Sequence, residues 1–141
     1  MNLYFSCSLT GGRTDEHIYT VIVEHLLAAG HEVPTAPLAS PGIMSEERVI
    51  DPRVVYQRDI NWITACDALI AEVSTPSHGV GYELAYALGI GKPALCCHRR
   101  DTPVSKMITG NTSPRLVVRG YEDEQHVLAL LDEFLSGLGS Q

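Results

Sequence analysis

The stretch ALIAEVSTPSHGVGYELAYALGIGKPALCCH, residues 68–98, decides the fold. Two short apolar runs, 68–73 and 94–98, flank a segment with helical periodicity from about Val80 to Ile90. The sequence Gly91-Lys92-Pro93 ends that helix and leads into the second run. A strand, a helix and a second strand in this order predict a parallel βαβ unit, because parallel neighbours need a crossover connection.

The same alternation of short apolar runs and helical patterns extends in both directions from this unit. Further strands are expected at 3–7, 31–37 and 116–118, and further helices at 14–29, 52–65 and 122–135. Prolines within 31–37 place that strand near an edge of the sheet. The sequence therefore predicts an α/β domain of three layers, Rossmann-like or flavodoxin-like, with a mainly parallel five-stranded sheet. Residues 38–50 are expected to form a lid or an irregular surface segment.

Length and composition point to one globular domain. The chain has 141 residues, 45% of them hydrophobic and 19% charged, so a single domain over residues 1–141 is expected. The net charge of −7 disfavours a nucleic acid as partner, because the phosphate backbone is also negative. No apolar run reaches the roughly 18 residues of a membrane span, and no signal peptide is recognisable, so no membrane partner is expected.

The cysteines and histidines do not form a recognisable metal motif. Cys7, Cys66, Cys96 and Cys97 contain no C-x-x-C pair, and the six histidines contain no H-x-x-x-H pair. Neither a metal nor another cofactor is expected. Reduced, buried thiols are typical of a cytoplasmic protein, which is the location we expect, with presence in the nucleus left open.

Two loops follow predicted strands and have the composition of anion-binding turns. The first contains Ser8, Thr10, Gly11, Gly12 and Arg13, whose hydroxyl groups, exposed backbone and guanidinium are all hydrogen-bond donors. Its spacing is neither that of a Walker A loop nor G-x-G-x-x-G. A plain turn into a capped helix would have a similar composition, so both interpretations stay open.

The second loop, residues 74–79, leads into the helix of the deciding stretch. Ser77, Gly79 and Gly81 precede Glu83, whose carboxylate lies in the first turn, where the helix dipole favours a negative charge. An ionised carboxylate beside such a loop can act as a nucleophile. Its alternative role is only to complement the helix dipole.

Asp59 and Tyr4 are further candidates for chemistry. Asp59 shares the apolar face of the 52–65 helix, so it needs a partner such as Arg58 or a catalytic role. Burial suits a general acid, and with Glu83 it would form the two-carboxylate arrangement that cleaves glycosidic bonds. Tyr4, at the end of the first strand, could hydrogen-bond a carboxylate or could simply pack in the core.

Three segments together resemble a known family. These are LYFSCSLTGGR (3–13), RDINWITACDALIAEVSTPSHGVGYELAYALGIGKPALC (58–96) and VSKMITG (104–110). They are similar to the 2′-deoxynucleoside 5′-monophosphate N-glycosidase (Rcl) family of the nucleoside 2-deoxyribosyltransferase superfamily. The resemblance covers nearly the whole chain, and GVGYELA after a Pro-Ser turn is its most specific part.

The resemblance implies hydrolysis of a nucleoside 5′-monophosphate to free base and sugar 5-phosphate, without a cofactor. It implies that Glu83 is the nucleophile that forms a covalent glycosyl intermediate, that Asp59 protonates the leaving base, and that Tyr4 supports the nucleophile. Substrate and phosphate contacts are implied for the two loops, at Ser8, Leu9, Gly11, Gly12, Arg13, Ser77 and Gly79. It further implies a homodimer in which Ser105 and Met107 reach into the neighbouring subunit's site.

The sequence departs from the family at two positions of the first loop. Cys7 stands where the family has glycine, and Thr10 where it has arginine. The second departure removes a cation near the expected phosphate. Three alternatives therefore stay open: a ribonucleotide N-glycosidase acting on cytidine monophosphate or its hydroxymethyl derivative, a nucleoside deoxyribosyltransferase, and a nucleotide-binding module without catalysis.

Overall fold

A four-stranded parallel sheet forms the centre of the computed structural model, which describes residues 1–139. The strands lie in the order β1 (Leu3–Ser6), β2 (Ala68–Glu72), β3 (Ala94–Arg99) and β4 (Leu116–Tyr121). Every neighbouring pair is parallel, as the βαβ pattern predicts. The last two residues of the expected domain, 140 and 141, lie outside the described part.

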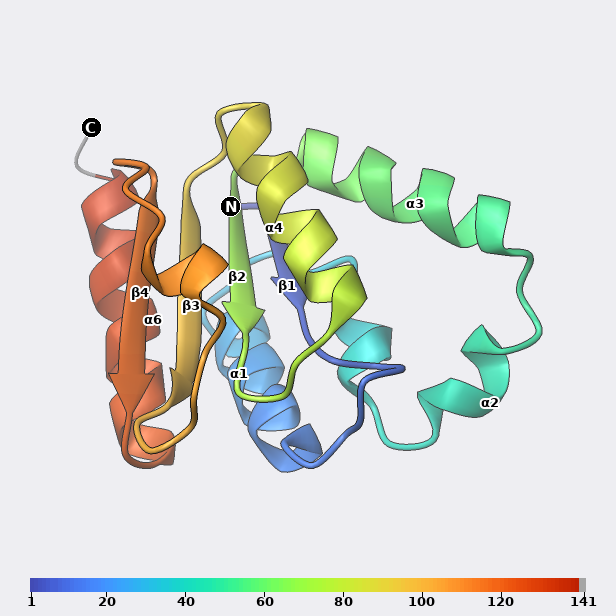
Figure 1. Cartoon of the computed structure of the whole chain (residues 1–141), viewed down its shortest axis with the longest axis horizontal. Coiled ribbons are helices and arrows are strands. Elements are labelled where there is room, and N and C mark those ends of the chain that lie inside the picture. The colour runs from blue at the N-terminus through green and yellow to red at the C-terminus, as the bar shows by residue number, and fades with distance from the viewer. Residues whose placement is uncertain (140–141) are drawn as a thin grey trace.

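Helices cover both faces of the sheet (Figure 1). They are α1 (Glu16–Ala28), the short 3-10 helix η1 (Ala36–Ala39), α2 (Ile43–Glu47), α3 (Pro52–Ala65), α4 (His78–Gly89), α5 (Lys106–Thr109) and α6 (Glu124–Gly139). Because side chains alternate along a strand, Leu3 and Phe5 pack with α1 and α6, whereas Tyr4 packs with α3 and α4. The three-layer α/β architecture is confirmed.

The expected fifth strand at 31–37 is wrong: within residues 1–139 the sheet has four strands. Only an isolated bridge between Asn2 and Glu32 forms there. Pro34 lacks an N–H group and begins a turn closed by the Ala36 N–H, which donates to the Val33 carbonyl at 3.0 Å. The Thr35 hydroxyl then accepts the Phe5 N–H at 3.0 Å, where a strand would have offered a carbonyl.

This shortened segment still runs beside the free edge of β1. The chain therefore leaves β1 through α1, on one face, to reach that edge, and returns through α3, on the other face, to β2. Connections that depart to opposite faces open a crevice beyond the carboxyl ends of the strands. This crevice lies beyond β1 and β2, next to the two loops singled out from the sequence.

The boundaries of the helices around this crevice follow local signals. Asp51 caps α3 by accepting the Arg53 N–H at 2.8 Å, and Pro52 takes the first helical position. Ser77 caps α4 by accepting the Val80 N–H at 3.4 Å. The irregular stretch 38–50 contains the end of η1 and α2, and α2 lies beside the crevice.

No helix within the described range 1–139 is both long enough and apolar enough to cross a membrane. The result agrees with the hydropathy of the sequence.

Thr35→Val tests whether the Thr35 hydroxyl replaces the missing strand. Valine has the same shape but cannot accept the Phe5 N–H, so a buried donor loses its partner. We expect the free energy of unfolding to fall by about 1–3 kcal/mol in urea denaturation. Thr64→Val, at an exposed position of α3, is the matched control. An equal effect of both substitutions would contradict the assigned role of Thr35.

Candidate functional site

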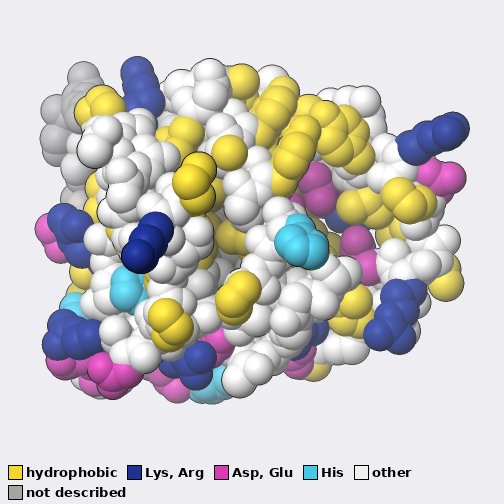
Figure 2. All heavy atoms as spheres, in the orientation of Figure 1, with side chains coloured by type: hydrophobic (Ala, Val, Ile, Leu, Met, Phe, Trp, Pro, Cys, Tyr) yellow, Lys and Arg dark blue, Asp and Glu magenta, His cyan; other side chains and the backbone are white. Residues whose placement is uncertain are grey.

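A cavity of about 470 Å³ occupies the crevice beyond β1 and β2. Its walls are formed by the loop after β1, by residues 43–50 (the α2 segment), by α3 and by the beginning of α4. Figure 2 shows this hollow at the right of the molecule, with acidic side chains inside it. The side chains of three acidic residues, Glu47, Asp59 and Glu83, line the cavity. Among the described residues that line it, Arg48 is the only lysine or arginine.

Glu83 projects from the second turn of α4 towards β1. Its Oε2 accepts a hydrogen bond from the hydroxyl of Ser6, a residue only 2% exposed. Burial raises the pKa of Glu83 to about 7, although hydrogen bonds from Ser6 and Tyr4 oppose that rise by stabilising the carboxylate. The nearby negative charge of Asp59 raises it further. Near neutral pH, Glu83 is therefore divided between its acid and its carboxylate forms.

Tyr4 lies deep under Glu83, with 1% of its surface exposed. Burial and the negative charges of Glu83 and Asp59 raise its pKa far above the usual range of a phenol. The hydroxyl therefore stays protonated, and its hydrogen bond to Glu83 opposes the rise in the pKa of that carboxyl.

Asp59 reaches the same cavity from α3. Its Oδ1 accepts a hydrogen bond from Nε of Arg58 at 2.8 Å, and the same guanidinium contacts Glu47 on α2. Burial raises the pKa of Asp59, and Arg58 opposes this rise as donor and as positive charge. Asp59 is thus paired with Arg58, one of the partners expected from the sequence, and it also lines the cavity.

The loop after β1 reaches the cavity through Leu9 and Thr10. Ser8 is fully buried, and its hydroxyl has no hydrogen-bond partner among the described residues. Gly11 lies so close to the next loop that a Cβ would clash with the Pro76 carbonyl oxygen. Gly12 has φ of 123°, which favours glycine. None of these three positions lines the cavity, and the two glycines let the two loops pack closely against each other.

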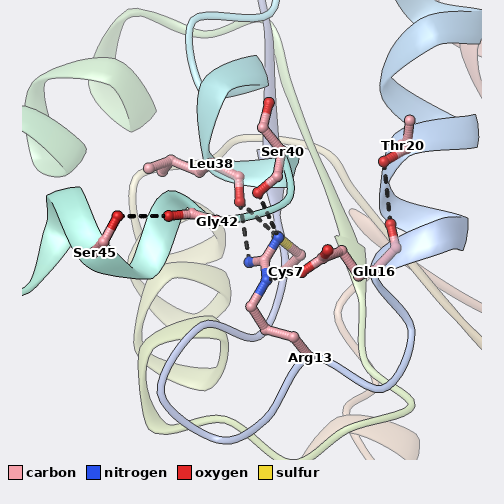
Figure 3. Close-up of polar contacts among 8 residues, drawn as sticks. All are labelled: Cys7, Arg13, Glu16, Thr20, Leu38, Ser40, Gly42 and Ser45. Atoms are coloured by element: carbon pink, nitrogen blue, oxygen red, sulfur yellow. Dashed lines mark hydrogen bonds and ion pairs between the residues drawn. The ribbon is translucent and has the colours of Figure 1, made fainter.

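Arg13 also lies outside the cavity lining, because its guanidinium is engaged elsewhere. Figure 3 shows it directed at the end of η1, where it donates to the carbonyl oxygens of Leu38 and Ser40, each at 3.1 Å. Its Nε also pairs with Glu16. Arg13 therefore ties the start of the 38–50 segment to the loop after β1.

The remaining candidates fall into two groups. Ser77 and Gly79 line the cavity at the start of α4. Ser105 and Met107 do not: they belong to a separate groove between α4 and α5, where Met107 is 85% exposed. A single chain therefore brings together Tyr4, Asp59, Glu83, Ser77 and Gly79, but not the α5 residues.

Sequence reasoning missed three residues of the site: Ser6, Glu47 and Arg58 as a partner of Glu47. Ser6 could have been found, because it lies two positions after Tyr4 and so shares its face of β1. No sequence pattern pointed to Glu47, because its contact partner Arg58 lies eleven positions away in the chain, on a different helix.

Metal ligands do not gather anywhere in residues 1–139: no group of three His, Cys, Asp or Glu side chains could hold an ion. Cys7, Cys66, Cys96 and Cys97 are free thiols.

A family model described as nucleoside 2-deoxyribosyltransferase matches residues 3–131. A protein of Methanosarcina mazei, provisionally named 2′-deoxynucleoside 5′-phosphate N-hydrolase 1, is 36% identical over 137 residues, which cover 97% of this chain and 85% of the relative. The 5-hydroxymethyl-dUMP N-hydrolase of Esox lucius is 38% identical over 144 residues and covers 98% of each chain.

Two solved structures share the fold. The CMP N-glycosidase of Clostridium botulinum superposes with a TM-score of 0.68 at 20% identity, covering 92% of this chain and 98% of its own. A designed Rossmann 2x3 protein gives a TM-score of 0.55 at 15% identity, covering 97% and 91%. At these identities the likeness concerns the Rossmann-like architecture alone.

Glu83→Gln tests the burial of the Glu83 carboxyl through stability. Below pH 4.5 the carboxyl is protonated in the folded and the unfolded chain, so its pKa has no effect. Between 4.5 and about 7 the unfolded chain releases the proton first, and the wild type loses stability that the uncharged glutamine keeps. We expect the stability gain of Glu83→Gln over wild type to grow by about 3 kcal/mol across this interval.

Urea unfolding at several pH values measures this gain. Glu46→Gln is the matched control, because Glu46 is exposed on α2 and does not line the cavity. A gain that does not change with pH would contradict the raised pKa of Glu83.

Proposed function

The chain belongs to the nucleoside 2-deoxyribosyltransferase family, and we propose that it hydrolyses the N-glycosidic bond of 2′-deoxynucleoside 5′-monophosphates. The products would be a free base and deoxyribose 5-phosphate. The observation that carries the proposal is the presence of Glu83 and Asp59 in the walls of one cavity. The names of the Methanosarcina mazei and Esox lucius relatives support the same substrate class.

Glu83 is the proposed nucleophile. Its carboxylate attacks C1′ of the sugar, the bond to the base breaks, and a glycosyl ester of Glu83 forms. Asp59 gives its proton to the departing base in the same step. Asp59 then takes a proton from water, which attacks C1′, so that the sugar phosphate leaves and both carboxyl groups return to their starting forms.

The contacts around each carboxyl suit these two roles. Burial raises the pKa of Glu83 to about 7, and the hydrogen bonds from Ser6 and Tyr4 oppose that rise, so part of Glu83 keeps the ionised form that attacks. Burial raises the pKa of Asp59, which favours the protonated form needed by an acid.

The phosphate site is proposed at the start of α4 and along the loop after β1. Ser77 and Gly79 line the cavity at a helix N-terminus, where N–H groups and the dipole favour an anion. Leu9 and Thr10 face the same space. Gly11, Gly12 and Arg13 would contribute by holding this loop in place, and the Ser8 hydroxyl, which has no partner in residues 1–139, would be free to bind the substrate.

We further propose a homodimer in which each subunit completes the other's site. Ser105 caps α5 and Met107 lies on it, and both are outside the cavity of their own chain. The groove between α4 and α5 is lined by apolar side chains, and Met107 projects from it. A second copy that covers this groove would bring its α5 close to the start of α4 and thus to the proposed phosphate site.

Glu83→Gln tests the assignment of the nucleophile. Glutamine keeps the shape of the side chain but is a poor nucleophile, so we expect base release to fall by at least about a thousandfold. The assay follows free base by chromatography for a panel of deoxyribo- and ribonucleoside monophosphates. Undiminished turnover in Glu83→Gln would rule out the proposed mechanism.

The panel also separates the open alternatives. Faster release from cytidine monophosphate than from any deoxynucleotide would favour a ribonucleotide enzyme. A new nucleoside after addition of a second base would favour a transferase, and binding without base release would favour a non-catalytic module. For the proposed enzyme, a slowly turned-over sugar analogue should leave its mass on the peptide that contains Glu83.

Mixing two inactive variants tests the shared site. Glu83→Gln chains lack the nucleophile, and Ser105→Ala chains lack the side chain offered to a neighbour. In a mixed dimer, one site receives Glu83 from one chain and Ser105 from the other. We expect an equal mixture to regain about a quarter of wild-type activity, because half of the dimers are mixed and each has one intact site. Activity equal to the average of the unmixed variants would contradict sharing.

A further inference from the structure

One guanidinium joins two walls of the cavity. Arg58 on α3 donates from Nη1 to Oε1 of Glu47 on α2 at 2.8 Å, and its Nη2 lies 3.4 Å from Oε2. Its Nε donates to Oδ1 of Asp59 at 2.8 Å. The proposed acid and the α2 segment therefore share a single cation.

All three charged side chains are largely removed from water. The exposed fractions are 22% for Arg58, 11% for Glu47 and 16% for Asp59. Charge-assisted hydrogen bonds are strong in such surroundings, and losing one partner leaves a charge uncompensated. Loss of Arg58 would leave two carboxylates without their common partner.

The aromatic ring of Trp62 supports the position of the Arg58 guanidinium. Consecutive residues on a helix point in different directions, so Arg58 reaches Asp59 only by folding its side chain along α3. Trp62, one turn further on, lies beneath the guanidinium with its ring centre 4.9 Å from the guanidinium carbon. This contact holds the planar fork where it reaches both carboxylates.

We propose that Arg58 is a positioning residue that holds Asp59 in the cavity wall and, with the same guanidinium, latches the α2 segment over the cavity. The inference rests on the proposed function for the role of Asp59. Arg13 fastens the beginning of the 38–50 segment, and Arg58 fastens its end through Glu47. Of the two arginines, only Arg58 also contacts a proposed catalytic group.

The shared cation predicts opposite effects of its two carboxylate partners. Arg58 lowers the pKa of Asp59, whereas the negative charge of Glu47 raises it. Glu83 and Tyr4 also face Asp59, since the charge of Asp59 raises the pKa of both. Removing Arg58 should therefore raise the pKa of Asp59, and removing the charge of Glu47 should lower it.

Carboxyl-carbon NMR of the aspartate-labelled full chain tests this prediction, with the Asp59 signal identified by its loss in Asp59→Asn. We expect Arg58→Gln to move the Asp59 titration to higher pH and Glu47→Gln to move it to lower pH. Arg58→Lys keeps the positive charge but lacks the planar guanidinium. The titration of Asp59 in this variant should therefore lie between those in the wild type and in Arg58→Gln. Arg53→Gln, at an exposed position of α3, is the control and should change nothing. Shifts of Arg58→Gln and Glu47→Gln in the same direction, or no shift in either, would overturn the proposal.

Trypsin cleavage after Arg48 tests the latch. Arg48 is an exposed residue at the end of α2, and cleavage there requires the segment to open. Loss of a charge-assisted pair should make cleavage about tenfold faster in Arg58→Gln and in Glu47→Gln, but not in Arg53→Gln. Cleavage at the wild-type rate in both variants would refute the latch.

Neither measurement depends on turnover. If Asp59→Asn kept full base release, the proposed catalytic role of Asp59 would fail. The titration and proteolysis results would still decide whether Arg58 holds Asp59 and α2. Failure of the inference can thus be told apart from failure of the proposed function.

Discussion

A carboxyl group buried at the end of a parallel sheet is the constraint around which this protein is organised. Glu83 loses hydration in the cavity, and that loss raises its pKa to about 7. Two hydroxyls from β1, those of Ser6 and Tyr4, meet it there. They are available because alternate residues of one short strand face α4 while Leu3 and Phe5 pack on the opposite face.

The segment 38–50 forms one wall of the cavity. Residues 38–50 contain little regular structure, and α2 has five residues, too few for a helix to be stable alone. Polar contacts at both ends replace the missing regularity: Arg13 binds backbone carbonyls at the start, and Arg58 binds Glu47 at the end. Leu38, Ala39 and Ile43 are buried, so apolar packing also fixes the first part of the segment, whereas its end depends on the pair of Arg58 and Glu47.

Hydrophobic periodicity was enough to predict the layers, the βαβ unit and α3, because each is encoded by local residues. It failed at 31–37, where apolar residues favoured a strand, but Pro34 imposed a turn and the Thr35 side chain took over a backbone role. Glu83 was singled out from topology, because it follows the loop at the carboxyl end of β2. Asp59 was singled out because it shares the apolar face of the 52–65 helix. The pairing of Asp59 with Arg58 was expected from the sequence and is present. The contacts of Arg13 with residues 38–40 and of Arg58 with Glu47 could not be predicted, because side-chain contacts with an irregular segment leave no periodic pattern in the sequence.

The turn at Pro34 explains both the missing strand at 31–37 and one wall of the cavity. A full strand over 31–37 would have carried the chain along β1 for the length of the sheet. The turn at Pro34 instead releases it after one bridge, and η1 begins at once. The residues thereby freed reach across the carboxyl end of β1, where Met44, Glu47 and Ile50 become cavity wall. A shorter sheet edge thus provides the chain that encloses the two carboxyl groups.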